Sequence, residues 1–84
     1  MEVEEKLKSI WYEILSKKGE APEEIQKDSN FFEIGGTSLF IGIMTIMIEK
    51  EFGVKIGTDI FYDNPTLGGI AEEIVSLSME EKGA

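Results

Sequence analysis

Residues 28–39 read DSNFFEIGGTSL, and the rest of the chain can be laid out around this segment. Its first ten residues belong to a longer region, residues 20–37. This region is rich in turn-forming and helix-breaking residues, and its apolar residues do not recur with a regular spacing. This pattern predicts a long structured loop. A loop of this length in a small domain is usually functional or pinned by its own side chains. The apolar residues expected to pin it are Ile25, Phe31, Phe32 and Ile34.

A first amphipathic helix is predicted before the loop. Apolar residues recur at i, i+4, i+7, i+8, i+11 and i+12, which places them on one face of a helix. They are Val3, Leu7, Ile10, Trp11, Ile14 and Leu15. The run Lys17-Lys18-Gly19 suits the end of this helix, because cations stabilise a helix C-terminus and glycine accepts the left-handed cap conformation.

The second long helix is predicted for residues 38–52, with Thr37 or Ser38 as its N-cap and Gly53 at its end.

Two further helices complete the chain. Residues 60–63 are expected to form a short helix that Asn64-Pro65 ends, and Thr66 can cap a last helix that runs to about Leu77. The polar tail, residues 78–84, is expected to fray. No segment alternates as a strand would, so the fold class is all-α, with three long helices and one short helix in a single domain of 84 residues.

Composition restricts the function classes. The 17 acidic residues against eight lysines give a net charge of -9, which repels nucleic acids and anionic membranes but attracts proteins with basic docking patches. There is no cysteine and no histidine, so the usual thiol nucleophile, general base and metal ligands are missing. We therefore expect no catalytic residue and no metal site. The N-terminus lacks a signal-peptide pattern and no apolar run reaches about 18 residues, so a cytoplasmic protein is expected.

The second helix has more apolar surface than one small core can bury. At about 100° per residue, one face of this helix suits the core. That face holds Phe40, Ile41, Met44, Ile48 and Phe52. The opposite face is also apolar and holds Leu39, Gly42, Ile43 and Ile46, with Met47 and Lys50 at its margin. This second face predicts an exposed patch that contacts other proteins. The alternative is that the loop of residues 20–37 covers it.

The segment Gly35-Gly36-Thr37-Ser38 lacks the partners of the common serine and phosphate motifs. A P-loop needs a lysine before the Thr-Ser pair, and a nucleophile elbow needs a glycine where Phe40 stands as well as a histidine. A calcium loop starting at Asp28 would need glycine and glutamate where Glu33 and Leu39 stand.

What remains is a serine at the positive end of an apolar helix, after two glycines that would let another protein's backbone come close. A phosphate ester on Ser38 would be stabilised there. The alternative is a serine that only caps the helix.

As a whole, residues 28–39 resemble the signature of peptidyl carrier proteins, D-x-N-F-F-x-[LI]-G-G-x-S-[LI]. The resemblance continues at the family's spacings through Phe52-Gly53-Val54, Asp59-Ile60-Phe61, Pro65-Thr66-Leu67 and Ile70-Ala71. It implies the acyl-carrier four-helix bundle. It also implies that Ser38 accepts 4′-phosphopantetheine from coenzyme A through a separate Mg-dependent phosphopantetheinyl transferase. The residues flanking the attachment point would be Gly35, Gly36, Thr37 and Leu39.

The same resemblance implies a carrier without catalytic activity of its own, a monomer that holds aminoacyl or peptidyl groups as thioesters. An adenylation enzyme would load the thiol, and condensation, tailoring or thioesterase enzymes of nonribosomal peptide synthesis would act on the thioester. The partner interface that it implies comprises Leu39, Gly42, Ile43, Ile46, Met47 and Phe61.

Some positions depart from the family pattern. Thr37 stands where histidine is frequent, Gly42 lies within the docking face, and Gly68-Gly69 replace better helix formers, so a loose start of the last helix is expected. Fatty-acid and polyketide carriers more often show Asp-Ser-Leu at the attachment point, so Thr37 favours the peptidyl branch.

Three alternatives are weighed beside the peptidyl carrier. An acyl or aryl carrier of a polyketide-type or hybrid pathway and an unmodified acidic interaction module remain open. A small hydrolase built on Ser38 is close to excluded, because no histidine can activate the serine. Met1 and the charged ends slightly favour a free-standing protein over an excised domain.

Overall fold

The computed structural model describes residues 2–17 and 24–83, and the side chains of residues 2–17 and 24–79. The helices, in chain order, are α1 (Glu2–Ser16), α2 (Ser38–Phe52), α3 (Asp59–Asp63) and α4 (Leu67–Gly83). No strand occurs in the described ranges, where Asn30 and Thr66 form only an isolated bridge. The all-α class with three long helices and one short one is confirmed. Lys18 and Gly19, predicted to end the first helix, lie outside the described residues.

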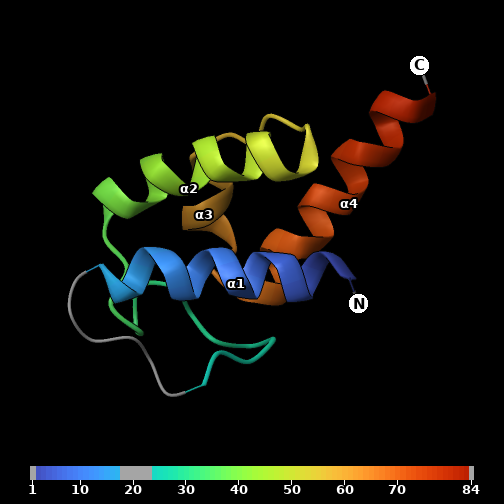
Figure 1. The fold of residues 1–84 in the computed structure, drawn as a ribbon. Helices are drawn as coiled ribbons and strands as arrows, with labels where there is room; N and C mark the ends of the chain where they lie inside the picture. The colour runs from blue at the N-terminus through green and yellow to red at the C-terminus, as the bar shows by residue number, and fades with distance from the viewer. Residues whose placement is uncertain (1, 18–23, 84) are drawn as a thin grey trace.

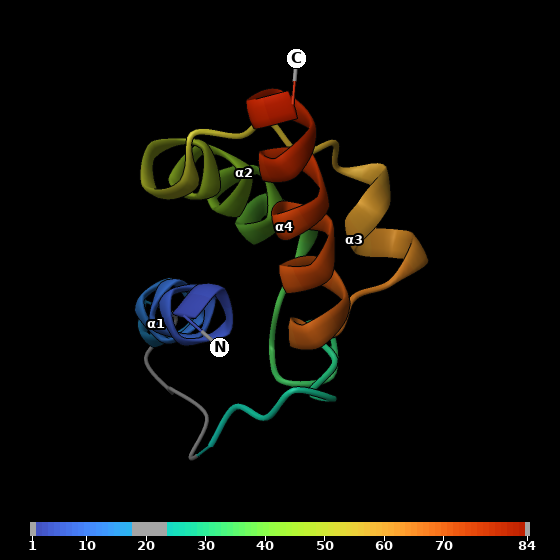
Figure 2. The same ribbon diagram turned by 90° about the vertical axis from the view of Figure 1, so that its right-hand side faces the viewer.

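The helices enclose one core. Figure 1 shows α2 above α1. Helix α4 crosses behind α1 and runs past the right-hand ends of both helices, and the loop from residue 24 onward passes beneath α1. In the view of Figure 2, α1 and α3 lie on opposite sides of α4. Helix α1 contacts both α2 and α4, so it is the element that the other long helices share.

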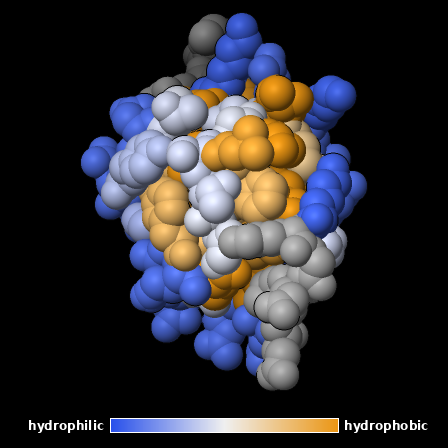
Figure 3. All heavy atoms as spheres, turned by 90° about the vertical axis from the view of Figure 1, so that its left-hand side faces the viewer, coloured by the Kyte–Doolittle hydropathy of each residue, from blue (hydrophilic) through white to orange (hydrophobic). Residues whose placement is uncertain are grey.

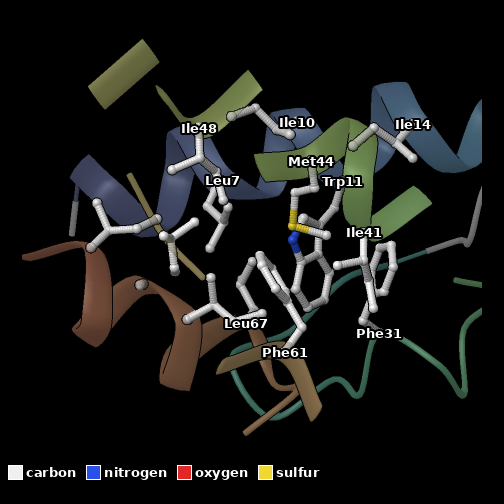
Figure 4. Packing of buried hydrophobic residues seen from close by; sticks show 14 of the residues in the cluster. Leu7, Ile10, Trp11, Ile14, Phe31, Ile41, Met44, Ile48, Phe61 and Leu67 are labelled. Atoms are coloured by element: carbon white, nitrogen blue, oxygen red, sulfur yellow. The ribbon is translucent and has the colours of Figure 1, made fainter. Parts of the chain in front are cut away.

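Trp11 lies at the centre of this core. Figure 4 shows its indole surrounded by Phe31, Met44 and Phe61, which come from the loop, α2 and α3. The rings of Trp11 and Phe31 meet edge to face, with centroids 5.1 Å apart and planes at 61°. Each large side chain buried in this way stabilises the fold by about 1.5 to 3 kcal/mol, so the core depends on the loop as well as on the helices.

Helix α2 buries the face that the helical wheel predicts. Ile41, Met44 and Ile48 are buried, and Phe40 and Phe52 pack at the edges of the core as partly buried side chains. The helix ends at Gly53, whose left-handed conformation (φ 73°) allows its N–H to donate to the carbonyl oxygen of Glu49 at 2.9 Å. The predicted core face and helix end are confirmed.

The loop before α2 is pinned by its own apolar residues, as predicted. Ile25 and Phe31 are fully buried and Ile34 packs against the core, whereas Phe32 lies at the surface. The backbone N–H of Ile25 also donates to the hydroxyl of Tyr12 at 2.9 Å, which ties the loop to α1.

The loop is also tied to the start of α4. The N–H groups of Phe31, Leu67 and Gly68 donate to the carbonyl oxygens of Pro65, Ser29 and Lys27 at 2.8, 3.2 and 2.8 Å. Thr66 caps α4 as predicted, because its Oγ1 accepts from the N–H of Gly69 at 3.1 Å.

These bonds hold the start of α4 against the loop, and its expected looseness stays a prediction. A Cβ at Gly68 would lie 2.7 Å from Cγ of Lys27 and 3.2 Å from the carbonyl oxygen of the same residue. The glycine therefore leaves room for both the side chain and the backbone of Lys27.

Helix α4 runs to Gly83 rather than to about Leu77. Its last part contains Glu80, Glu81 and Lys82, which are good helix formers and carry no stop signal before the glycine. The predicted helix end is therefore too early, while fraying of this tail stays a prediction. Within residues 2–17 and 24–83, each helix falls short of the length or the apolar content needed to cross a bilayer.

Candidate functional site: the start of α2 and its outer face

Ser38 is the first residue of α2, and its side chain is exposed. The N-cap is Thr37, in an extended conformation (φ -130°, ψ 169°), and its Oγ1 accepts from the N–H of Phe40 at 3.4 Å. Its carbonyl oxygen accepts from the N–H of Ile41 at 3.0 Å. Of the two predicted cap candidates, Thr37 therefore has the role. The hydroxyl of Ser38 makes no hydrogen bond within the part of the chain that the structure describes, so it has no structural task there.

The start of α2 suits an anion attached to Ser38. The N–H groups of the first helical turn have no partner inside the helix, and the helix dipole places partial positive charge at this end. The first turn of α2 contains no acidic residue, although the chain carries a net charge of -9. A phosphodiester on Ser38 Oγ would thus meet free N–H donors without a carboxylate in the same turn.

Gly35 and Gly36 shape the backbone that leads to Ser38. Gly35 has a φ of 112°, a backbone angle that residues other than glycine rarely adopt. The N–H of Gly36 donates to the carbonyl oxygen of Phe31 at 2.8 Å, and a Cβ at this position would overlap the Phe31 ring. The sequence suggested that the two glycines make room for another protein, but they are needed by the loop itself.

The outer face of α2 is exposed where the helix begins. Leu39 is 72% exposed and Ile46 is 57% exposed, and Gly42 lies at the surface between them. Figure 3, which views the side of the molecule where α2 begins, shows apolar surface gathered at the centre and flanked by hydrophilic residues. The loop leaves these three residues uncovered, so their predicted exposure is confirmed. Contact with a partner protein stays a prediction.

Two other residues of the predicted patch are only partly exposed. Ile43 and Met47 pack against the core. On a wheel whose buried side centres near about 270°, they lie at about 140° and about 180°, between the buried side and the outer face near about 90°. Met47 also lines a cleft between α1 and α2, together with Ile10 and Lys50. The patch is therefore narrower than predicted and centres on Leu39, Gly42 and Ile46.

Phe61 does not belong to a surface. It is fully buried in the core, so its predicted place in the partner interface is wrong. The exposed aromatic residue of α3 is its neighbour Tyr62, which is 57% exposed and stacks on Phe32 with centroids 5.5 Å apart. Adjacent helical residues point about 100° apart, and in α3 Phe61 enters the core while Tyr62 faces outward. The sequence reasoning missed Tyr62, because a helix of five residues gives no period that separates the inner aromatic from the outer one.

Comparisons with known proteins place this serine within a matched region. A family model described as a phosphopantetheine attachment site matches residues 5–74. Phosphinothricin tripeptide synthetase PhsC of Streptomyces viridochromogenes is 35% identical over 79 residues, and the hybrid PKS-NRPS synthetase xenE of Xenoacremonium sinensis is 32% identical over 81 residues. These matches cover 94% and 96% of this chain but only 7% and 2% of the two synthetases.

A solved structure matches the whole bundle as well. The complex of the phosphopantetheine transferase Sfp with coenzyme A and a peptidyl carrier protein contains a chain that superposes with a TM-score of 0.79. That chain is 27% identical, and the match covers 88% of this chain and 90% of the other. The predicted four-helix carrier fold is confirmed. From the matched family model, the fold and the exposed serine at a capped helix start, it follows that the chain belongs to the phosphopantetheine attachment site family.

Proposed function

We propose that Ser38 carries 4′-phosphopantetheine and that the chain is a peptidyl carrier, which holds aminoacyl or peptidyl groups as thioesters. One observation carries the assignment of Ser38. Thr37 caps α2, and the Ser38 hydroxyl is exposed without a hydrogen bond among the described residues. A serine that served only as a cap would have this bond instead of Thr37.

The attachment step needs only a presented hydroxyl from this chain. Ser38 Oγ forms a new bond to the phosphorus that carries the pantetheine arm of coenzyme A. The bond from this phosphorus to the adenosine bisphosphate portion breaks, and the serine proton goes to a base on the transferase. The chain has no histidine to act as this base, so we assign the base and Mg²⁺ to the transferase.

The attached arm supplies the thiol that a chain without cysteine lacks, and this thiol forms the thioester. The contribution of the carrier is then to hold the phosphodiester at the positive end of α2 and to present a surface to its partners. In this proposal the domain acts as a monomeric tether and catalyses no step.

The partners proposed beyond the transferase are an adenylation enzyme and condensation, tailoring or thioesterase enzymes. The similarity to part of a tripeptide synthetase supports a peptidyl cargo. The similarity to part of a hybrid PKS-NRPS synthetase supports, as second candidate, an acyl cargo in a hybrid pathway. Whichever of the two cargoes the chain holds, the surface of α2 proposed to contact the partner enzymes centres on Leu39, Gly42 and Ile46. Ile43 and Met47 lie at the edge of this surface.

Intact mass spectrometry tests the proposal. Apo protein is incubated with coenzyme A, Mg²⁺ and the Sfp transferase, and a mass increase of one phosphopantetheinyl group is expected. Ser38→Ala should remain unmodified, whereas Thr37→Ser, which keeps a capping hydroxyl, should be modified. If the wild-type protein stays unmodified under conditions that modify another carrier protein, the carrier function is refuted. The alternative of an unmodified interaction module would then remain.

A further inference from the structure

A cleft lies between α1 and α2, the two helices that Figure 1 shows one above the other. Its volume is about 390 Å³, which falls in the range of about 300 to 1,000 Å³ that small-molecule sites usually have. The attachment chemistry at Ser38 makes no use of this cleft, so the cleft is a candidate for a separate binding task.

The inner surface of the cleft is apolar, and an ion pair joins its two walls. Ile10 of α1 is buried and Met47 of α2 is partly buried, and both line the cleft. Lys6 Nζ of α1 lies 3.8 Å from Glu51 Oε1 of α2, and these two residues also line it. The cleft thus has an apolar interior and one pair of charges that already neutralise each other.

Two further charged side chains of the cleft stay open to a ligand. Glu13 of α1 and Lys50 of α2 are exposed, and neither makes an ion pair among the residues that the structure describes. A carboxylate accepts from an ammonium group, and a lysine ammonium donates to a carbonyl oxygen. A ligand that suits the whole cleft has an ammonium group, a carbonyl group and an apolar side chain close together. An α-amino acid linked through its carboxyl group has these three parts.

We propose that the α1–α2 cleft receives the aminoacyl group on the phosphopantetheine arm, and that it favours amino acids with apolar side chains. This inference rests on the proposed function. Glu13 accepts from the α-ammonium group, and Lys50 donates to the thioester carbonyl oxygen. Ile10 and Met47 provide the surface for the side chain.

The arm is long enough for this contact. Met47 follows Ser38 by nine residues and Lys50 follows it by twelve, which is about 14 Å and about 18 Å along the helix axis. From phosphorus to sulfur, the extended arm is about as long as four to five peptide residues, about 16 Å. Ser38 and Lys50 also belong to one row of residues spaced by four, which winds around α2 from the attachment point to the cleft. The amino acid beyond the sulfur therefore reaches Glu13 and Lys50.

The tether favours this occupant over a free amino acid or a side chain of a partner enzyme. A group held on a short flexible linker has an effective concentration on the order of millimolar. It can therefore occupy a cleft whose intrinsic affinity is weak, whereas a separate molecule loses translational and rotational freedom on binding. Because Glu13 and Lys50 are exposed to water, each contact with them is weak, and the tether makes such contacts sufficient.

NMR spectroscopy tests the proposal on the intact carrier. The Sfp transferase modifies ¹⁵N-labelled wild type with coenzyme A, acetyl-coenzyme A or leucyl-coenzyme A, and spectra are recorded at a pH of about 6.5, where an α-amino group is protonated. Compared with the protein that carries the bare arm, the leucyl form should show shifted backbone amides at Ile10, Glu13, Met47 and Lys50. The acetyl form lacks the ammonium group and the side chain, so these amides should not shift.

Glu13→Gln removes the carboxylate that accepts from the ammonium group and keeps the size of the side chain. Because Glu13 is exposed, the melting temperature should stay unchanged, while the leucyl-dependent shifts should fall to about half or less. Hydrolysis of the leucyl thioester should become about twofold faster or more, because a group outside the cleft is open to water. Glu5→Gln, an exposed change elsewhere on α1, is the matched control and should behave as wild type.

The opposite outcomes are distinct. Leucyl-dependent shifts confined to the start of α2, or equal shifts in the acetyl and leucyl forms, would show that the cleft does not recognise the aminoacyl group, while the carrier function stands. The same shifts after adding equimolar free leucine to the unmodified protein would assign the cleft to free amino acids. Failure of wild type to accept the arm from coenzyme A would remove the proposed function and this inference with it.

Discussion

The rings of Phe32 and Tyr62 stack at the protein surface, with centroids 5.5 Å apart and planes at 25°. Phe32 belongs to the loop that leads to Ser38 and Tyr62 belongs to α3, so the stack joins two elements on the outside of the bundle. Phe32 also meets the buried ring of Phe31 edge to face at 6.1 Å. The three rings form a continuous contact from the core to the surface.

We predict that Phe32 and Tyr62 are energetically coupled. In a double-mutant cycle with Phe32→Ala and Tyr62→Ala, the coupling should be about 0.5 to 1.5 kcal/mol, the usual value for an aromatic pair. Urea denaturation of the four proteins measures it. Additive effects of the two substitutions would mean that the stack is not maintained in solution.

The two residues at the start of α2 should behave in opposite ways. Thr37→Ala removes the cap and should lower the free energy of unfolding by about 0.5 to 2 kcal/mol. Ser38→Ala removes a hydroxyl without a structural partner among the described residues and should change it by less than about 0.5 kcal/mol. Thermal denaturation monitored by circular dichroism compares them. A clear loss of stability in Ser38→Ala would assign the capping role to Ser38 instead.

Gly36→Ala should destabilise the loop. The new Cβ would overlap the Phe31 ring, which is fixed against Trp11 in the core, so a cost of about 1 to 3 kcal/mol is expected for the forced shift. Tryptophan fluorescence during denaturation detects both the lost stability and the disturbed environment of the indole. An alanine variant as stable as wild type would show that Phe31 can move without loss.

Ile46 and Ile43 should separate contact with partners from contribution to the core. Ile46→Asp alters a side chain that is 57% exposed, so we expect little change in melting temperature but weaker modification or loading by partner enzymes. Ile43→Asp places a charge where the side chain packs against the core and should lower the melting temperature as well. Equal stability of the two variants would contradict the different burial of these residues.

The core provides a reference for these substitutions. Met44→Ala removes a fully buried side chain and should cost roughly 2 to 5 kcal/mol, a large part of the stability of so small a domain. Denaturation in urea checks this value. A loss below 1 kcal/mol would mean that the neighbours of Met44 collapse into the space.

The long helices could be predicted because their buried faces repeat with the helical period. In α2 the angular spacing alone separates Ile41 and Met44, which are buried, from Leu39, which is exposed. The same spacing puts Ile43 between the buried face and the outer face of α2. Whether a side chain at this place is buried depends on how closely the neighbouring helices and the loop approach α2. That distance is a property of the packed bundle, and no local pattern contains it.

Loop and short-helix features escaped prediction for the same reason. The need for Gly36 follows from the position of the Phe31 ring. The need for Gly68 follows from the side chain and backbone of Lys27, which comes from a distant part of the chain. The inward direction of Phe61 rather than Tyr62 is likewise set by where α3 docks. By contrast, Ser38 could be proposed from sequence because helix chemistry and the surrounding signature both point to it.

The hydrogen bonds from Phe31 to Pro65 and from Leu67 to Ser29 have a consequence for biosynthesis. The segment that leads to Ser38, the proposed attachment point, is completed by residues that the ribosome adds much later. A nascent chain that ends before Pro65 has no acceptor for the Phe31 amide, and the capped start of α2 lacks that support. Maturation of the carrier should therefore follow translation of α4 rather than accompany the emergence of Ser38 from the exit tunnel.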